Sequence, residues 1–229
     1  MKICLPRRTL IAAIGISFLC PLAHLKCLGS EGSGVFNHTV ELAGQSHIAP
    51  LHFGLNQTID VNLSGFGSNL YLKQVVITGV LNTYGGSWVN DVAFQFRSPG
   101  SFSGNFSLYP ASGQFQNGNG IGVGPASTTL DVPFTVSNDR QLSILLFDTS
   151  YDVAGQPDAT WQSGAIELTI GQCLPADMSE PYGLLNFFDV SKFLEAFGSH
   201  DPSADVNGDG EFNFFDVSTF LSAFTNGCP

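Results

Sequence analysis

Side chains that carry oxygen alternate along the C-terminal segment DVNGDGEFNFFD, residues 205–216. Numbered from its first aspartate, the segment has oxygen donors at positions 1, 3, 5, 7, 9 and 12 and a glycine at position 6. Calcium binds about six to eight hard oxygen ligands, and a glycine at that position allows the sharp turn that gathers them. We therefore predict a calcium site with the ligands Asp205, Asn207, Asp209, Glu211 (through its backbone carbonyl), Asn213 and Asp216.

The spacing matches the EF-hand calcium loop at every ligand position except the last, which is Asp216 here and glutamate in the motif. The shorter side chain must be drawn inward by the start of the following helix, or it binds through one oxygen. Magnesium is disfavoured because it rarely takes so many protein ligands. The alternative is a turn rich in Asp and Asn that caps the helix and binds no ion.

The region around this loop is duplicated. NFFDVSKFLEAF, residues 186–197, and NFFDVSTFLSAF, residues 213–224, agree at ten of twelve positions. In each copy the apolar side chains recur with the spacing of one helical face. They are Val190, Phe193, Leu194 and Phe197 in the first copy and Val217, Phe220, Leu221 and Phe224 in the second. The duplication predicts two copies of one loop–helix unit that share a small core.

A related but altered loop, DMSEPYGLLNFFD, precedes the first helix. It is one residue longer than the second loop and has Pro181 where a ligand is expected, with Glu180 beside it as a substitute. The oxygen donors that correspond to ligands of the second loop are Asp177, Ser179, Asn186 and Asp189. We predict a weaker calcium site here, and a loop without an ion is the open alternative.

The N-terminus, residues 1–29, has the pattern of a secretory signal peptide. Basic side chains at its start precede an apolar run from Leu10 to Leu22, and small residues follow. A membrane anchor is the alternative, but the apolar run is short and contains Pro21. We predict a protein that is secreted, either to the extracellular space or to the cell surface.

Removal of this segment changes both the cysteine count and the charge. Three of the five cysteines lie before residue 30, which leaves Cys173 and Cys228. In an oxidising compartment, two cysteines that bracket one segment are most simply explained as a disulfide. Four of the eight basic residues are also removed but none of the 19 acidic ones, so the chain should repel nucleic acids and anionic membranes and suit calcium. No other stretch is long and apolar enough to span a membrane.

Short alternating or apolar segments, separated by Gly, Asn, Ser and Pro, fill residues 35–170. Turn signals spaced by roughly ten residues favour an all-β sandwich of about eight or nine strands. We assign this sandwich to residues 30–171 and an all-α unit to residues 172–229, so the predicted fold class is mainly β. The glycine-rich segment 114–128 is predicted to be a long loop between strands.

The duplicated loops and helices, flanked by two cysteines, resemble the dockerin module. The resemblance is closest to the dockerin-like C-terminal anchor of secreted planctomycete proteins. Within Cys173–Pro229 it is carried by CLPAD, two copies of NFFDVS-x-FL-x-AF, DP-x-ADVNGDG and the final GCP. It implies two calcium-loaded loop–helix units related by a pseudo-twofold axis. It also implies docking onto a cohesin-like protein or another protein of the cell surface or extracellular space.

In dockerins, the two positions before the last ligand help to select the partner and are commonly small and polar. Here both copies have phenylalanine at these positions, which argues against a standard cohesin as the partner. The residues concerned are Phe187, Phe188, Phe214 and Phe215. Consecutive residues at a helix start point about 100° apart, so we expect one of each pair to pack in the core and the other to bind the partner. The alternative is that the phenylalanines only enlarge a small core.

Two segments of the sandwich, VNDVAFQFRSPG and LSILLFDTSYDVAGQPDATWQSGAIELTI, weakly resemble the jelly-roll P domain of secreted proteases and CUB-type modules. The resemblance implies a non-catalytic module, with Asp148, Asp152 and Asp158 as candidate ligands of a further calcium ion. The histidines at positions 38, 47, 52 and 200 fit no ligand motif.

Two function classes follow from these observations. The first is a secreted, non-catalytic binding or structural sandwich, with a carbohydrate as a candidate ligand, anchored through a calcium-dependent dockerin-like module. The second is a small carbohydrate-active enzyme of the glycoside hydrolase type that carries the same module and acts on polysaccharide. The acidic pairs of Asp148 with Asp152 and Asp158 with Glu167 keep a glycosidase dyad open.

Overall fold

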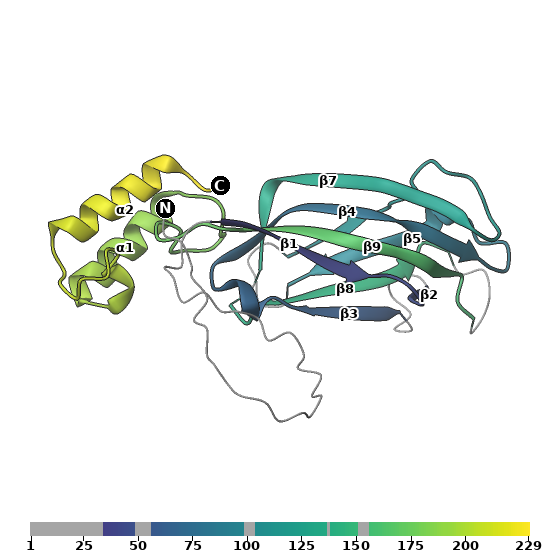
Figure 1. Cartoon of the computed structure of the whole chain (residues 1–229), viewed down its shortest axis with the longest axis horizontal. Helices are drawn as coiled ribbons and strands as arrows, with labels where there is room; N and C mark the ends of the chain where they lie inside the picture. The colour runs from purple at the N-terminus through teal and green to yellow at the C-terminus, as the bar shows by residue number, and fades with distance from the viewer. Residues whose placement is uncertain (1–33, 49–55, 99–103, 137, 151–155) are drawn as a thin grey trace, which may run out of the picture. The chain divides into compact units, whose positions relative to one another are not determined.

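The computed structural model describes residues 34–48, 56–98, 104–136, 138–150 and 156–229. The predicted signal peptide, residues 1–29, lies outside this part of the chain. The described residues form two antiparallel sheets followed by two helices (Figure 1). The fold is therefore mainly β, a β-sandwich followed by a small helical unit, which confirms the predicted fold class.

The first sheet has the strand order β1-β9-β4-β7, and β2 pairs with the start of β9. Its strands are β1 (Gly34–Glu41), β2 (Ser46–His47), β4 (Leu70–Thr83), β7 (Ile121–Thr135) and β9 (Ala159–Gln172). In β9, the alternate residues Ile166, Leu168 and Ile170 are buried and those between them are not. This period of two is expected of a strand with one face on a core.

The second sheet has the strand order β3-β8-β5-β6. Its strands are β3 (Gln57–Asn62), β5 (Val92–Arg97), β6 (Asn105–Leu108) and β8 (Gln141–Asp148), and the 3₁₀ helices η1 (Ser64–Phe66) and η2 (Val89–Asp91) lie in connecting segments. The apolar core contains side chains from both sheets. Phe94 of β5 and Trp161 of β9, for example, are fully buried with ring centroids 5.9 Å apart.

The prediction of a long loop over residues 114–128 is wrong for its second half. β7 begins at Ile121 and pairs with β4, with Gly122 opposite Val80. Ile121 and Val123 are buried, so these residues contribute to the core despite the glycine between them. β7 pairs only with β4 and is an edge strand, where glycine and proline are tolerated.

The two helices are α1 (Phe187–Ser199) and α2 (Phe214–Asn226). Each begins with a capping box, in which the side chain of an asparagine accepts from a backbone N–H of the helix, and the aspartate three residues later accepts from the backbone N–H of that asparagine. Phe193 of α1 stacks on Phe220 of α2 with ring centroids 4.1 Å apart. The predicted apolar stripe is wrong at Leu194 and Leu221, which are 58% and 50% exposed, because two short helices bury only a narrow face.

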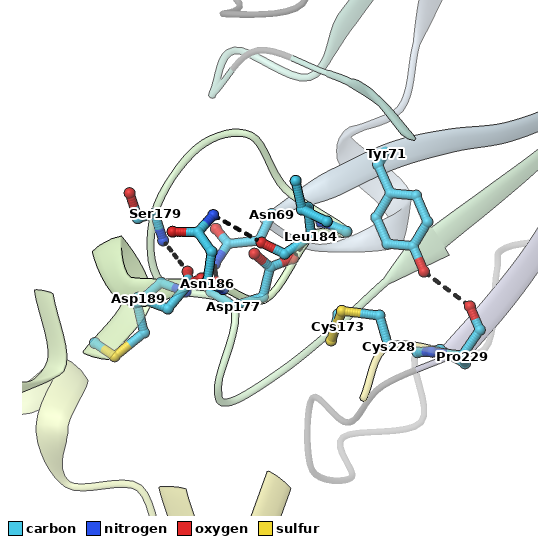
Figure 2. Close-up of a disulfide and its surroundings, with 12 residues drawn as sticks. Asn69, Tyr71, Cys173, Asp177, Ser179, Leu184, Asn186, Asp189, Cys228 and Pro229 are labelled. Atoms are coloured by element: carbon cyan, nitrogen blue, oxygen red, sulfur yellow. Dashed lines mark hydrogen bonds between the residues drawn. A yellow bond between two sulfur atoms is a disulfide. The ribbon is translucent and has the colours of Figure 1, made fainter. Parts of the chain in front are cut away.

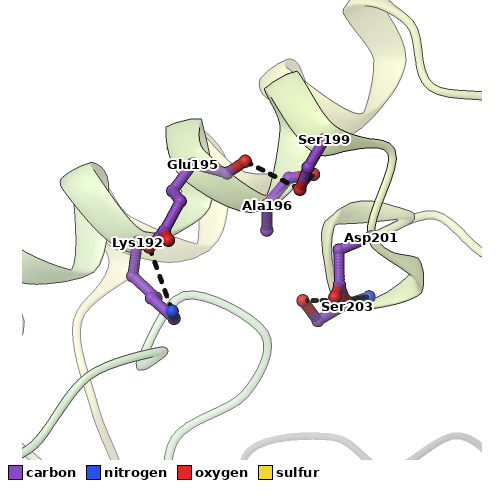
Figure 3. A network of polar contacts seen from close by, with 6 residues as sticks. All are labelled: Lys192, Glu195, Ala196, Ser199, Asp201 and Ser203. Atoms are coloured by element: carbon purple, nitrogen blue, oxygen red, sulfur yellow. Dashed lines mark hydrogen bonds and ion pairs between the residues drawn. The ribbon is translucent and has the colours of Figure 1, made fainter.

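A polar segment leads from α1 to the second loop (Figure 3). On α1, Lys192 and Glu195 form an ion pair at 3.0 Å, and the hydroxyl of Ser199 donates to the carbonyl of Glu195 at 3.0 Å. Asp201 then caps the short 3₁₀ helix η3 (Pro202–Ala204) by accepting from the backbone N–H of Ser203 at 2.9 Å. Between these contacts α1 ends at its C-terminal cap, His200, which has φ of 54° and donates its backbone N–H to the carbonyl of Phe197 at 3.3 Å.

Candidate calcium loops and aromatic pairs

The second loop is wrapped around the carboxylate of Asp205. Its Oδ1 accepts from the backbone N–H groups of Gly208 at 2.9 Å and Asp209 at 3.1 Å, and its Oδ2 accepts from Gly210 at 2.9 Å. Gly210 has φ of +82°, a conformation that glycine adopts without strain. The glycine predicted to make the sharp turn therefore makes it, and the first predicted ligand organises the loop.

Asp216 closes the loop from the helix side. It is the third residue of α2, and its carboxylate turns back to accept from the backbone N–H groups of Asn213 at 3.0 Å and Asn207 at 3.3 Å. The hydrogen bond from Asn213 lowers the pKa of Asp216 below its usual range. The carboxylate of Asp216 thus bonds to the backbone at the Asn207 turn and at the start of the helix.

The remaining predicted ligands of the second loop bond to one another. The side-chain oxygen of Asn207 accepts from the N–H of Asp209 at 2.8 Å, and Asp209 accepts from the N–H of Glu211 at 2.8 Å. Asn213 caps α2 by accepting from Phe215 at 2.8 Å. Within the described residues, the carboxylates of Asp205, Asp209 and Asp216 do not all lie within 4.8 Å of one another.

The first loop repeats part of this arrangement. Asp189 of α1 accepts from the N–H groups of Met178 and Ser179, both at 2.9 Å, and from Asn186 at 2.8 Å. Asn186 caps α1, as Asn213 caps α2. The hydroxyl of Ser179 instead donates to the carbonyl of Glu180 at 3.3 Å. Asp189 and Asn186 therefore lie as their counterparts do, while the middle of the loop differs.

Asp177, the first predicted ligand of this loop, is fully buried. Its Oδ2 accepts from the backbone N–H of Gly183 at 2.7 Å, whereas its Oδ1 has no hydrogen-bond partner. Burial raises the pKa of Asp177 to about 7 against the effect of the Gly183 hydrogen bond, and the negative charge of Asp189 raises it further. A buried carboxylate with an unsatisfied oxygen is unfavourable, and a hard cation is a partner that would satisfy it.

Both loops therefore offer donors that suit calcium. The second loop offers oxygen donors of the carboxylate, amide and carbonyl types and a glycine in the turn, and the first offers the unsatisfied oxygen of Asp177. The residues that would hold the ion in the second loop are Asp205, Asn207, Asp209, Glu211, Asn213 and Asp216. Those in the first loop are Asp177, Ser179, Asn186 and Asp189. Calcium would neutralise their carboxylates and fix the loop relative to the helix that follows.

The predicted disulfide between Cys173 and Cys228 is present (Figure 2). The two sulfur atoms and a carboxylate oxygen of Asp177 lie within 4.8 Å of one another, the one such group of three Cys, His or acidic side chains in the described part of the chain. Both sulfurs are bonded to each other, so neither is a thiolate that binds a metal. The cluster is therefore a disulfide beside a buried carboxylate.

The prediction that one phenylalanine of each pair packs in the core is wrong. Phe187, Phe188, Phe214 and Phe215 are 75%, 65%, 74% and 67% exposed. The place between the helices is filled by Phe193 and Phe220, one turn or more further along each helix. Within each pair the ring centroids lie 6.3 and 6.4 Å apart. The structure thus leaves two aromatic pairs on the surface, each next to a candidate calcium loop.

His47 is a buried histidine of the sandwich whose environment requires the neutral form. Its Nε2 accepts from the indole N–H of Trp161 at 2.9 Å, so Nδ1 carries the proton and donates to the carbonyl of Phe147 at 3.0 Å. Burial lowers the pKa of His47 to about 4. This histidine is satisfied by its partners and is not a metal ligand.

The stability of the sandwich is expected to fall as the pH drops from about 6.5 to about 4 because of His47. The unfolded chain takes up a proton near pH 6.5 while the folded chain resists it, so stability present above that pH is lost on acidification, by roughly 3 kcal/mol. Urea unfolding at pH 7 and pH 4.5 measures this loss. The variant His47→Gln, which keeps a donor and an acceptor, should lose less between the two pH values; an equal loss would contradict the assignment.

Asp158 and Glu167, one of the two predicted acidic pairs of the sandwich, do not form the dyad that a glycoside hydrolase requires. Asp158 is buried just before β9, whereas Glu167 is exposed in the middle of that strand. About nine residues of extended chain separate them by roughly 25–30 Å, and a catalytic pair lies within about 10 Å. Asp148 and Asp158, two of the candidate ligands of a further calcium ion, belong to no group of three acidic, Cys or His side chains with ligand atoms within 4.8 Å of one another in the described residues. Asp152, the third candidate ligand, and His52 lie outside the described residues.

Sequence reasoning missed a set of residues where the sandwich meets the C-terminal unit. Asn69 and Tyr71, at the start of β4, donate hydrogen bonds to the backbone carbonyls of Asp177 and Pro229 at 2.5 and 2.9 Å (Figure 2). The hydroxyl of Tyr182 donates to Asn138 at 3.0 Å. These residues are far apart in the sequence, and the one local signal is the altered first loop.

None of the helices in the described part of the chain is long and apolar enough to cross a membrane.

No protein-family model matches the sequence, and no curated protein matches it either. Among solved structures, a serine protease of Aeromonas sobria is similar at a TM-score of 0.37 with 10% identity, over 61% of this chain and 27% of the protease. Tomato aspermy virus has a TM-score of 0.28 with 10% identity, over 69% of this chain and 86% of that chain. Desmodium yellow mottle tymovirus has a TM-score of 0.23 with 12% identity, over 72% of this chain and 94% of that chain. These similarities are too weak to relate this chain to any of the three proteins.

Proposed function

We propose that the protein is a secreted, non-catalytic β-sandwich protein that docks onto a protein of the cell surface or extracellular space through its calcium-loaded loop–helix pair. The observation that carries the proposal is the exposure of all four phenylalanines at matched positions of the two repeats. Each pair stands directly before the last candidate calcium ligand of its loop, Asp189 or Asp216. The resemblance of residues 173–229 to dockerins, which dock onto cohesins, supports the same conclusion.

The exposed apolar surface beside the loops includes two leucines in addition to the four phenylalanines. Leu194 and Leu221 follow Phe187 and Phe214 by seven residues, so they lie on the same face of each helix, and both leucines are exposed. Apolar side chains gain about 25 cal/mol per Å² when a partner removes them from water. Aromatic side chains are frequent among the residues that dominate binding energy. The surface therefore suits a protein partner with an apolar groove, of the cohesin-like or another extracellular class.

Calcium would make this docking conditional. Phe214 and Phe215 lie between Asn213, which caps α2, and Asp216, which closes the capping box, and both of these flanking residues are candidate ligands. An ion held by the loop fixes the start of the helix and with it the two rings. Without an ion, the carboxylates of the loop repel one another and the rings are less well placed.

The experiment that tests the proposal measures retention of the full chain on secreted cell-envelope protein in calcium. The double variant Phe214→Ala with Phe215→Ala should be retained about 30-fold less, equivalent to about 2 kcal/mol. Phe115→Ala is the matched control, since Phe115 is 73% exposed but belongs to the sandwich. Equal retention of the control and the double variant would contradict the assignment of the docking surface.

A further inference from the structure

The first loop differs from the second at Pro181, Tyr182 and Gly183, and each of these residues contacts the sandwich. Pro181 lines a surface pocket together with Phe106 of β6 and Val132 of β7. The hydroxyl of Tyr182 donates to Asn138 at 3.0 Å. A methyl group at Gly183 would lie 2.6 Å from the ring of Tyr71, so the glycine backbone packs directly on that ring. The altered part of the loop is thus the part that lies on the sandwich.

Asp177 is positioned by the same contacts. Its backbone carbonyl accepts from the side-chain amide of Asn69 at 2.5 Å, and its carboxylate accepts from Gly183, which packs on Tyr71 (Figure 2). Asn69 therefore bonds to the main chain of Asp177. Tyr71 packs against Gly183, whose N–H bonds to the Asp177 carboxylate. The carboxylate oxygen that remains, Oδ1, is buried and has no hydrogen-bond partner.

In the second loop, the first candidate ligand is held by hydrogen bonds from the loop itself. The N–H groups that bond to the carboxylate of Asp205 come from Gly208, Asp209 and Gly210, all within the loop itself. In the first loop, Pro181 has no N–H to offer, and Asp177 accepts from Gly183 alone. The carboxylate of Asp177 thus accepts fewer backbone hydrogen bonds than that of Asp205. The sandwich residue Asn69 instead bonds to the backbone carbonyl of Asp177.

We propose that the sandwich completes the first calcium loop: Asn69 and Tyr71 are positioning residues that set Asp177 for the ion, and the bound ion fastens the C-terminal unit to the sandwich. The proposal rests on the proposed function in taking calcium as the ion. Coupling of this kind is reciprocal, so contacts that raise calcium affinity are strengthened by calcium to the same extent. The two loops would then have different tasks, the first at the junction and the second at the docking surface.

The test uses the full chain with Asp205→Ala, which leaves the first loop as the site under study. Terbium is the probe, followed through tyrosine-sensitised luminescence, because Tyr182 lies in the first loop and residues 205–216 contain no Tyr or Trp. Asn69→Gly removes the amide at a residue with φ of 53°, which glycine adopts without strain. Arg140→Gly, at another sandwich residue with φ of 58°, is the matched control.

Asn69→Gly should weaken terbium binding about tenfold, the usual effect of losing a residue that orients a metal ligand. Arg140→Gly should leave it unchanged. Asn69→Asp, which keeps the size but replaces the donor with an acceptor, should also weaken it. In calcium chelator the melting temperature of Asn69→Gly should fall only by the effect of one lost hydrogen bond, and the increase that calcium produces should be smaller than in the parent.

Three results would overturn the inference. The first is equal terbium affinity of the parent and both Asn69 variants, and the second is a loss of melting temperature that is the same with and without calcium. The third is the absence of terbium binding in the Asp205→Ala parent. The proposed function is checked separately by calcium binding to the second loop in an Asp177→Ala chain, so failure of one does not entail failure of the other.

Discussion

Replacing Asp205 by alanine should abolish tight calcium binding to the second loop, with affinity lowered by more than about a hundredfold. The carboxylate is a candidate ligand, and it also accepts the three backbone N–H groups that shape the loop. Its loss therefore removes one ligand and disorganises the others. Calorimetric titration of the full chain with calcium measures the effect, and Asp209→Ala should act in the same direction.

Asp131→Ala is the control for this series, because Asp131 is an exposed aspartate of β7, outside both loops. It should bind calcium as the unaltered chain does. Undiminished affinity in both Asp205→Ala and Asp209→Ala would mean that the alternating donors are only turn and cap residues.

Replacing Phe220 by alanine should lower the stability of the C-terminal unit by about 3–5 kcal/mol. Phe220 is 1% exposed and stacks on Phe193, and the core of this unit contains few other fully buried side chains. The core of this unit is too small for neighbouring side chains to fill the cavity that the replacement would leave. Thermal unfolding in calcium measures the change.

Phe214→Ala provides the comparison, because Phe214 lies on the same helix but is 74% exposed. Its replacement should change stability by no more than about 0.5 kcal/mol. Equal destabilisation by the two replacements would show that the exposed phenylalanines support the fold, and the aromatic pairs would then lose their role as a docking surface.

The parts of the fold that the sequence predicts are those set by local patterns. The alternation of Ile166, Leu168 and Ile170 marks a strand with one buried face, and the duplicated NFFDVS segments mark two capped helix starts. The disulfide follows from the two cysteines that remain after the predicted signal peptide. Neighbouring residues carry the information for the strand and the helix starts, and the number of remaining cysteines carries it for the disulfide.

The parts that could not be predicted depend on contacts between distant residues. Ile121 and Val123 are strand residues because β4 pairs with them, although their glycine-rich sequence favours a loop. Both phenylalanines of each pair are exposed because Phe193 and Phe220 already fill the space between the helices, which helix geometry alone does not reveal. The contact between Asn69 and Asp177 joins residues 108 positions apart, and no local pattern announces it.

The central claim is that the C-terminal unit docks onto an extracellular protein when it holds calcium. The most direct measurement is the affinity of the full chain for cell-envelope protein, first in calcium and then in excess chelator, beside the Asp205→Ala variant in calcium. The account predicts binding of the unaltered chain in calcium, loss of that binding in chelator and a similar loss in the variant. Binding that is equally strong under all three conditions would contradict it.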